Sequence, residues 1–125
     1  MEKPTLPLQA AFAREFARAW AEAWNSHDLE RILAHYDDEA ILSSPVVLER
    51  LGGDGALRGK AALRDYFSRG LEAYPDLRFD LVETFWGTET VVVCYRNNHR
   101  GSKTAEVMLL NGAGRVTRVW ANYDQ

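Results

Sequence analysis

The chain has 125 residues, of which 46% are apolar and 26% charged, and this balance fits one globular domain. It carries 15 basic and 18 acidic side chains without any basic run, which disfavours nucleic-acid binding and strong attraction to anionic membranes. The single cysteine, Cys94, excludes an intrachain disulfide, and no stretch approaches the roughly 18 apolar residues of a membrane span. Because the first residues also lack the pattern of a signal peptide, we expect a soluble cytoplasmic protein.

The first third of the chain predicts two helices after a short tail. Residues 1–7 contain two prolines and no periodic pattern, so we expect a flexible tail before a single domain over residues 8–125. Aromatic and alanine side chains then recur at three- and four-residue steps, which predicts an amphipathic helix over about residues 8–25. A break follows, in which His27 is expected at a capping or surface position, and then a second helix over about residues 29–36.

The middle of the chain predicts short strands, a glycine-rich loop and a third helix. The acidic residues 37–39 are expected in a solvated turn, residues 40–44 in a short strand that Pro45 ends, and residues 46–48 in a second short strand. Residues 50–59 hold four glycines in an order that matches neither a dinucleotide-binding nor a phosphate-binding loop. We therefore expect a flexible loop there, at the rim of a pocket, and a helix over about residues 60–71 after it.

The C-terminal part of the chain changes from helical to strand periodicity. Four runs of alternating or β-branched residues are separated by turns that contain glycine, and these runs cover about residues 77–82, 91–95, 105–110 and 116–123. Helices followed by consecutive antiparallel hairpins are typical of an α+β fold. Three helices can cover only part of one sheet face at this length. The uncovered part should form a pocket or be closed by a second subunit.

Five short segments add a resemblance to this pattern. They are AWNSHDLE at residues 23–30, SP at residues 44–45, GK at residues 59–60, YPDL at residues 74–77 and NGAGRV at residues 111–116. In this order they resemble the nuclear transport factor 2-like superfamily, and within it SnoaL-like and steroid-isomerase-like single-domain proteins. The resemblance implies a cone: three N-terminal helices packed on a strongly curved, mostly antiparallel sheet that encloses an apolar pocket, often with a homodimer through the sheet. Because this fold hosts enzymes, binding modules and interaction domains alike, it does not by itself identify a function.

The resemblance also implies where steroid-isomerase chemistry would need its groups. In that branch an acid just before the proline after the first short strand abstracts a proton, while a tyrosine and a second, protonated acid donate hydrogen bonds to the enolate oxygen. These positions fall on Ser44, Trp20 and Glu106 of this chain. A serine needs a base of its own and an indole only donates, so only Glu106 is a suitable group and steroid-isomerase chemistry is disfavoured.

Glu106 is the candidate catalytic residue. It interrupts an otherwise apolar strand, AEVMLL at residues 105–110, and strand alternation places it on the same face as Met108. If that face is the inner one, desolvation raises the pKa of Glu106 and makes it a general acid or base near neutral pH. The alternative is a glutamate that faces solvent, or pairs with an arginine, on the convex face.

The predicted ligand-binding residues come from two helices, the first strand and three late strands. They are Trp20, Ser44, Tyr66, Tyr95, Asn97, Met108, Val119 and Tyr123. His99 is expected either at the cavity mouth, where it could shuttle protons, or in a solvated hairpin end. No spacing of His, Cys, Asp or Glu resembles a metal site, no cofactor is expected, and Cys94 is expected in the core. A hydrolase triad around Ser44 is disfavoured because the nucleophile-elbow motif is missing.

The last strand leaves the position of Trp120 open. Val119, Ala121 and Tyr123 share one face, and Trp120 lies on the other. By resemblance the first set lines the cavity and Trp120 anchors a homodimer through the sheet, whereas the opposite assignment puts Trp120 in the pocket. We expect a domain that binds a small, largely apolar molecule, with isomerase- or cyclase-like proton transfer through Glu106 if it is an enzyme. The alternatives are a non-catalytic binding module with the same pocket and a dimerisation domain whose cavity is packed shut.

Overall fold

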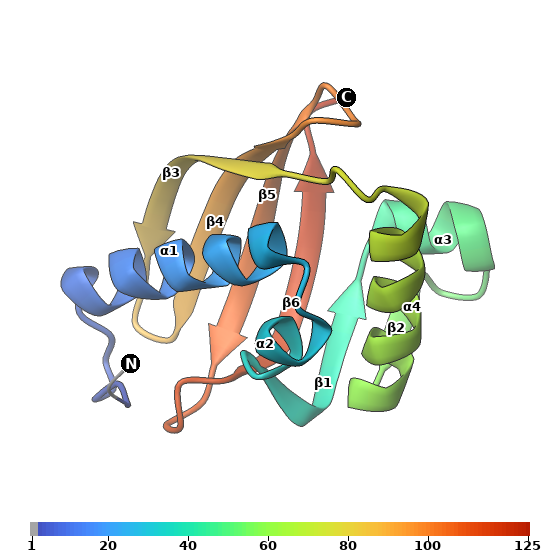
Figure 1. The fold of residues 1–125 in the computed structure, drawn as a ribbon. Coiled ribbons are helices and arrows are strands. Elements are labelled where there is room, and N and C mark those ends of the chain that lie inside the picture. The colour runs from blue at the N-terminus through green and yellow to red at the C-terminus, as the bar shows by residue number, and fades with distance from the viewer. Residues whose placement is uncertain (1–2) are drawn as a thin grey trace.

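The computed structural model describes residues 3–125 and consists of helices packed on one face of a curved six-stranded sheet (Figure 1). The helices are α1 (Ala10–Ser26), α2 (Leu29–Leu33), α3 (Pro45–Leu51) and α4 (Lys60–Ala73). The strands are β1 (Tyr36–Ser43), β2 (Ala56–Arg58), β3 (Phe79–Trp86), β4 (Thr90–Asn97), β5 (Lys103–Leu110) and β6 (Val116–Tyr123). Their order in the sheet is β2-β1-β6-β5-β4-β3, and only the β1–β6 pair is parallel. The expected α+β fold, with four consecutive antiparallel strands at the end of the chain, is confirmed.

Helix α1 packs across the inner face of the sheet on the side of β3 and β4, whereas α3 and α4 lie beyond β1 (Figure 1). Its buried face combines small and large side chains: Ala13, Phe16, Ala17, Trp20, Ala21, Ala23 and Trp24. The alanines let the helix approach the sheet closely, and the aromatic rings fill the remaining space. The ring of Trp20 lies 5.7 Å from that of Phe79 and 5.4 Å from that of Tyr95, measured between centroids. The core is therefore densest under α1.

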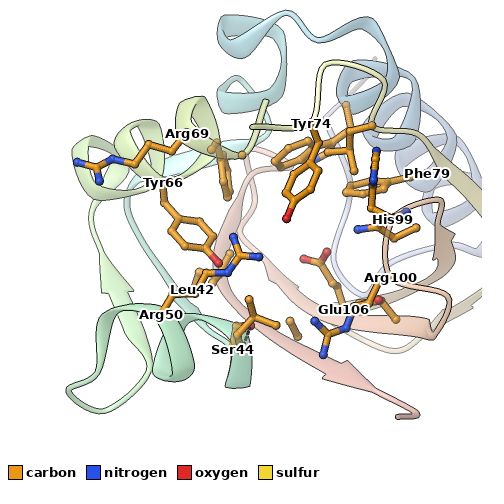
Figure 2. A pocket seen from close by; sticks show the side chains of 18 of the residues that line it. Leu42, Ser44, Arg50, Tyr66, Arg69, Tyr74, Phe79, His99, Arg100 and Glu106 are labelled. Atoms are coloured by element: carbon orange, nitrogen blue, oxygen red, sulfur yellow. Dashed lines mark hydrogen bonds between the residues drawn. The ribbon is translucent and has the colours of Figure 1, made fainter. Parts of the chain in front are cut away.

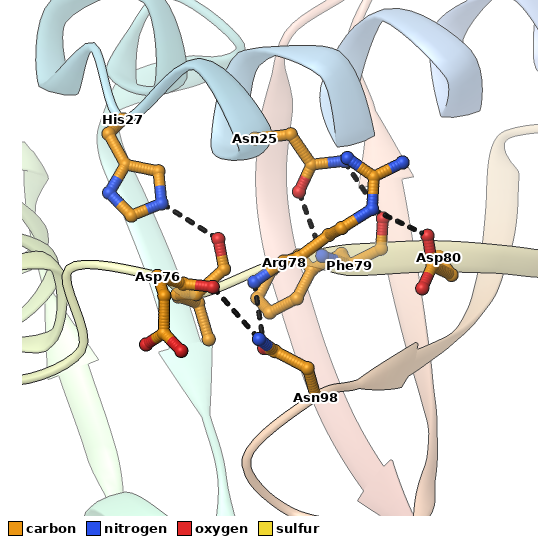
Figure 3. A network of polar contacts seen from close by, with 8 residues as sticks. Asn25, His27, Asp76, Arg78, Phe79, Asp80 and Asn98 are labelled. Atoms are coloured by element: carbon orange, nitrogen blue, oxygen red, sulfur yellow. Dashed lines mark hydrogen bonds and ion pairs between the residues drawn. The ribbon is translucent and has the colours of Figure 1, made fainter.

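A pair of hydrogen bonds joins the end of α1 to the beginning of β3 (Figure 3). The side-chain amide of Asn25 donates to the carbonyl oxygen of Phe79 at 2.9 Å, and its oxygen accepts from the N–H of Phe79 at 2.8 Å. His27 ends the helix in the left-handed conformation, with φ of 60°, and its Nε2 lies 2.7 Å from the carbonyl oxygen of Leu77. His27 is thus at a capping position, as expected. Together these contacts fix where β3 starts against α1.

The second helix is shorter than expected, and the acidic residues after it lie in a strand. Helix α2 ends at Leu33, and residues 37–39 belong to β1 rather than to a solvated turn. The sheet causes this change, because the N–H of Val116 donates to the carbonyl oxygen of His35 at 2.8 Å and Tyr36 pairs with Val116. The acidic side chains still reach solvent, since this part of β1 departs from regular pairing before Ile41.

Residues 46–48 form helix α3 instead of the expected short strand. Ser44 is the N-cap, and its Oγ accepts from the N–H of Val46 at 3.1 Å. Pro45 occupies the first helical position, where its missing N–H costs no hydrogen bond. The segment 50–59 is also not entirely a loop, because β2 pairs with β1 within it. The third expected helix is confirmed as α4.

The outer face of the sheet carries Trp120, whose side chain is 39% exposed there. Its neighbours in sequence on β6, Val119 and Ala121, are buried on the inner face, so the alternative that puts Trp120 in the pocket is wrong. Cys94 is half-buried and pairs with Ala105 on the outer face, so it is not the core residue that the sequence predicted.

The first helix begins at Ala10, two residues later than expected. Leu8 is nevertheless buried, and its N–H donates to the carbonyl oxygen of Thr88 at 2.9 Å. Residues 1 and 2 of the expected tail lie outside the described residues, and the flexibility of the tail stays a prediction. Within residues 3–125, no helix is both long enough and apolar enough to cross a membrane.

We expect Asn25→Ala to lower the free energy of unfolding by about 2 kcal/mol, because it removes two partly buried hydrogen bonds and leaves the backbone groups of Phe79 unpaired. Asn25→Asp should lower the free energy of unfolding by at least as much at neutral pH, since a carboxylate oxygen would then face the carbonyl oxygen of Phe79. Urea unfolding followed by circular dichroism measures both, with Arg14→Ala, at an exposed position of α1, as the control. A loss for Asn25→Ala no larger than that of the control would contradict this role.

Candidate functional site

A cavity of about 480 Å³ lies between the inner face of the sheet and helices α3 and α4 (Figure 2). Helix α1 contributes only Trp24 to its wall, because the rest of that helix covers the opposite side of the sheet. The other lining residues come from β1, α3 and its N-cap, α4, the loop before β3, strands β3 to β6, and the turn between β4 and β5. The apolar part of the wall includes Leu42, Val46, Leu51, Phe67, Leu77, Phe79 and Ala121.

Six of the nine residues predicted for the site line this cavity: Ser44, Tyr66, Tyr95, Asn97, Glu106 and Tyr123. The other three do not reach it. Met108 and Val119 pair with each other on the inner face, but they have no exposed surface and belong to the core. Trp20 is likewise fully buried, one helical turn before Trp24. Alternation gives the face of a strand and not the depth along it, which explains why Met108 and Val119 lie outside the cavity lining. The spacing of the resemblance places Trp20, on α1, in the site, but the cavity wall takes Trp24 from that helix instead.

Glu106 is the only carboxylate among the described lining residues, and its carboxyl group is directed into the cavity (Figure 2). Glu106 as a whole is only 7% exposed. The hydroxyl of Tyr95, on the neighbouring strand, donates to its Oε2 at 2.5 Å. Burial raises the pKa of Glu106 to about 7, and the hydrogen bond from Tyr95 opposes part of that rise. The acid is therefore divided between its protonated and ionised forms at neutral pH.

Tyr36 is a site residue that the sequence analysis missed. It is fully buried in the cavity wall, and the indole Nε1 of Trp20 donates to its hydroxyl oxygen at 3.0 Å. Since an indole only donates, this contact does not use the phenolic proton of Tyr36. Burial, and secondarily the charge of Glu106, raise the pKa of Tyr36, so the hydroxyl remains protonated. The spacing of Tyr36 from Ile32 had indicated a helix, which hid its role.

Trp24 offers a second donor to the same cavity. Its Nε1 is buried and has no hydrogen-bond partner within residues 3–125. The ring packs at 4.8 Å from Phe67 and 5.2 Å from Phe79, so its orientation is fixed. A buried donor without a partner costs free energy, and an acceptor on a ligand would recover it.

The mouth of the cavity is polar. The exposed Arg100 lies there, with its guanidinium carbon 4.2 Å from the centroid of the Tyr123 ring, and the hydroxyl oxygen of Tyr123 lies 3.4 Å from that of the buried Ser44. His99 also lines the cavity, and its Nε2 lies 2.6 Å from Oδ1 of Asp76. His99 is exposed in the β4–β5 turn and also lines the cavity, so the two positions expected for it coincide.

Neither a hydrolase triad nor a metal site forms among these groups. Ser44 caps α3, whereas His35 packs edge-on against Phe16 and His99 contacts Asp76. Within the described part of the chain, no three His, Cys, Asp or Glu side chains lie close enough together to hold a metal ion. Among the described lining residues, the titratable and hydrogen-bonding groups include one carboxyl, one imidazole, several hydroxyls and guanidinium groups.

Three arginines that the sequence analysis did not single out stand around the cavity: Arg50, Arg69 and Arg100. Arg69 pairs with Asp65, Nε to Oδ2 at 3.2 Å, and points away from the cavity (Figure 2). Arg50 and Arg100 are exposed, and neither forms an ion pair within residues 3–125. They come from α3 and the β4–β5 turn, which only the tertiary fold brings together.

Similarities to solved structures agree with this architecture. A SnoaL-like protein of unknown function from Burkholderia thailandensis is 38% identical, with a TM-score of 0.91 over 95% of this chain and 100% of the other. A candidate isomerase of the SnoaL-like family from Agrobacterium tumefaciens is 18% identical, with a TM-score of 0.73 over 92% of this chain and 99% of the other. AclR, a candidate hydroxylase from Streptomyces galilaeus, is also 18% identical, with a TM-score of 0.73 over 93% of this chain and 77% of the other.

The two more distant structures share the fold alone, and no curated protein matches the sequence significantly. The profile of the SnoaL-like domain, however, matches residues 17–122, which includes most of α1 and all of the strands except the last residue of β6. Together with the first structure above, this match covers nearly the whole domain. The chain therefore belongs to the SnoaL-like family and has the nuclear transport factor 2-like fold.

Proposed function

We propose that this domain binds a small, largely apolar carbonyl compound in its cavity and transfers a proton on it with Glu106, as an isomerase- or cyclase-like enzyme. The observation that carries the proposal is one buried carboxyl, with its pKa raised to about 7, that opens into a cavity of about 480 Å³. A group with such a pKa accepts and releases a proton readily at neutral pH, as acid–base catalysis requires. The candidate isomerase among the structural relatives is consistent with this class of reaction.

The proposed reaction begins with the ionised form of Glu106. Its carboxylate takes a proton from a carbon next to the substrate carbonyl, and the electron pair of the broken C–H bond moves onto the carbonyl oxygen as an enolate forms. The free donors of Tyr36 and Trp24 lie in the same cavity wall and would stabilise that oxygen. In a substrate whose carbon–carbon double bond is conjugated with the enolate, Glu106 then returns the proton to the far end of the dienolate. The double bond moves next to the carbonyl as the enolate oxygen becomes a carbonyl again, which completes an isomerisation without any further reactant.

Tyr95 is a positioning residue in this scheme. Its hydroxyl donates to Oε2 of Glu106, which fixes the carboxyl group and leaves Oε1 for the substrate. The same hydrogen bond favours the ionised form, and so it keeps the pKa of Glu106 from rising further. Burial and Tyr95 thus act in opposite directions, and the balance leaves the pKa near neutrality.

We also propose that two copies associate through the outer face of the sheet. Phe85, Val92, Val107 and Trp120 pair across β3, β4, β5 and β6, so they form one apolar row on that face. Phe85 is 52% exposed and Trp120 39% exposed. Burying such a row against its own copy removes aromatic surface from water, and aromatic side chains are frequent anchors of interfaces.

The proton-transfer proposal predicts that the protein accelerates hydrogen–deuterium exchange next to the carbonyl of ketones that fit the cavity. Proton NMR in deuterated buffer measures the exchange rate. Because Glu106 must be ionised to act as a base, the rate should rise with pH through about 7 and then level off. Glu106→Gln should lower the rate by about a hundredfold or more, since the amide cannot accept the proton.

Tyr95→Phe is the matched variant for this experiment. It keeps the ring and removes the hydrogen bond that lowers the pKa of Glu106, so the midpoint of the pH profile should move to higher pH. An exchange rate that is equal in the wild type and in Glu106→Gln would exclude Glu106 as the base. The binding module without catalysis would then be the better description if ligands still raise the melting temperature.

The association of two copies predicts a dimer mass in light scattering at micromolar concentration. Trp120→Glu replaces the aromatic anchor at the β6 end of the row with a charge and should give the mass of a single chain. Thr88→Glu, at an exposed turn outside the row, adds the same charge and should remain dimeric. A wild type with the mass of one chain would refute the interface.

A further inference from the structure

The cavity has opposite electrostatic characters at its two ends. Its depth holds Glu106, which is 7% exposed and bonded to Tyr95. Its mouth holds Arg50 and Arg100, both exposed and without an ion pair within residues 3–125. The whole chain has a net charge of −3, so a positive mouth is not a consequence of overall composition. A concave site of low polarity concentrates such a field and attracts anions.

Tyrosine hydroxyls lie within the field of both guanidinium groups. Burial raises the pKa of Tyr66 and of Tyr123, while Arg50 and Arg100 each act in the opposite direction on both hydroxyls. Arg100 stacks on the ring of Tyr123, a geometry that leaves its N–H groups available at the edge. The two guanidinium groups and the two hydroxyls all belong to residues that line this cavity. An oxyanion accepts hydrogen bonds from both kinds of group.

We infer that the ligand of this cavity is an organic acid, with its carboxylate held by Arg50 and Arg100 at the mouth and its apolar, carbonyl-bearing part placed in the depth beside Glu106. This inference rests on the proposed function and names the substrate class for it. Arg69 is excluded from the anion site, because it pairs with Asp65 and points away from the cavity (Figure 2). The anionic end orients the molecule, so that its reactive carbon lies next to Glu106 rather than at the mouth.

A pair of fluorescent probes separates the two parts of this inference. Anilinonaphthalene sulfonate has an apolar ring system with one anionic group, and phenylnaphthylamine has the same ring system without it. The anion should bind more tightly than the neutral probe to the wild type. Arg50→Gln combined with Arg100→Gln should weaken binding of the anion by about tenfold or more and leave the neutral probe unchanged. Arg69→Gln is the matched control and should change neither.

The indole N–H signals report where the probes bind. Trp24 lines the cavity with an unpartnered N–H, whereas Trp120 lies on the outer face of the sheet. In nitrogen–proton correlation spectra, a probe in the cavity should shift the signal of Trp24 and leave that of Trp120 in place. A higher salt concentration should weaken binding of the anionic probe and leave binding of the neutral probe unchanged, because salt screens the charge of the anion.

The outcomes distinguish this inference from the proposed function. If both probes shift Trp24 but the double arginine variant binds the anion as tightly as the wild type does, the anion site is refuted and the cavity proposal stands. If neither probe shifts Trp24, both proposals are refuted. If the double variant loses affinity for the anionic probe while the neutral probe still binds beside Trp24, the result would support the inference that the ligand is an organic acid.

Discussion

The burial of one carboxyl group on the inner face of the sheet is the constraint around which this site is built. A rise in the pKa of Glu106 from 4.5 to about 7 corresponds to about 3 kcal/mol against its ionised form. An apolar side chain at the same place would avoid that cost. The hydrogen bond from Tyr95 keeps the ionised form accessible. In the proposed reaction, the donors of Tyr36 and Trp24 would stabilise the negative charge that develops on the ligand oxygen.

The cavity exists because the helices divide the inner face of the sheet between them. Helix α1 covers the inner face of the sheet at β3 and β4, where Trp20 is fully buried. The two hydrogen bonds between the Asn25 side chain and the backbone of Phe79 hold the end of α1 against β3. Helices α3 and α4 stand apart from α1, so the remaining face is lined without being filled (Figures 1 and 2). The same division places the acid at the bottom and two arginines at the rim. A ligand that spans both would be oriented by its charge.

Much of the fold was predictable from periodicity, because one face of each late strand is buried. Alternation correctly put Tyr95, Asn97 and His99 on one face, and Glu106 with the inner residues of β5. Alternation does not indicate whether an inner-face residue lies under α1 in the core or beyond the end of α1 in the cavity. Tyr36 fitted a helical spacing until the parallel pairing of β1 with β6 drew it into the sheet. The arginine pair joins residues fifty positions apart, so only the assembled fold could reveal it.

The most direct test is the titration of the Glu106 side chain, followed by carbon NMR of its labelled carboxyl group. Glu106→Gln identifies the signal, because this variant removes the carboxyl resonance of Glu106 and leaves those of the other carboxyl groups. We predict a midpoint near 7, well above the ordinary value of 4.5, and a higher midpoint in Tyr95→Phe. A midpoint at or below 4.5 would mean that the group is solvated or paired with a cation, and it would contradict a desolvated acid poised to move protons in the cavity.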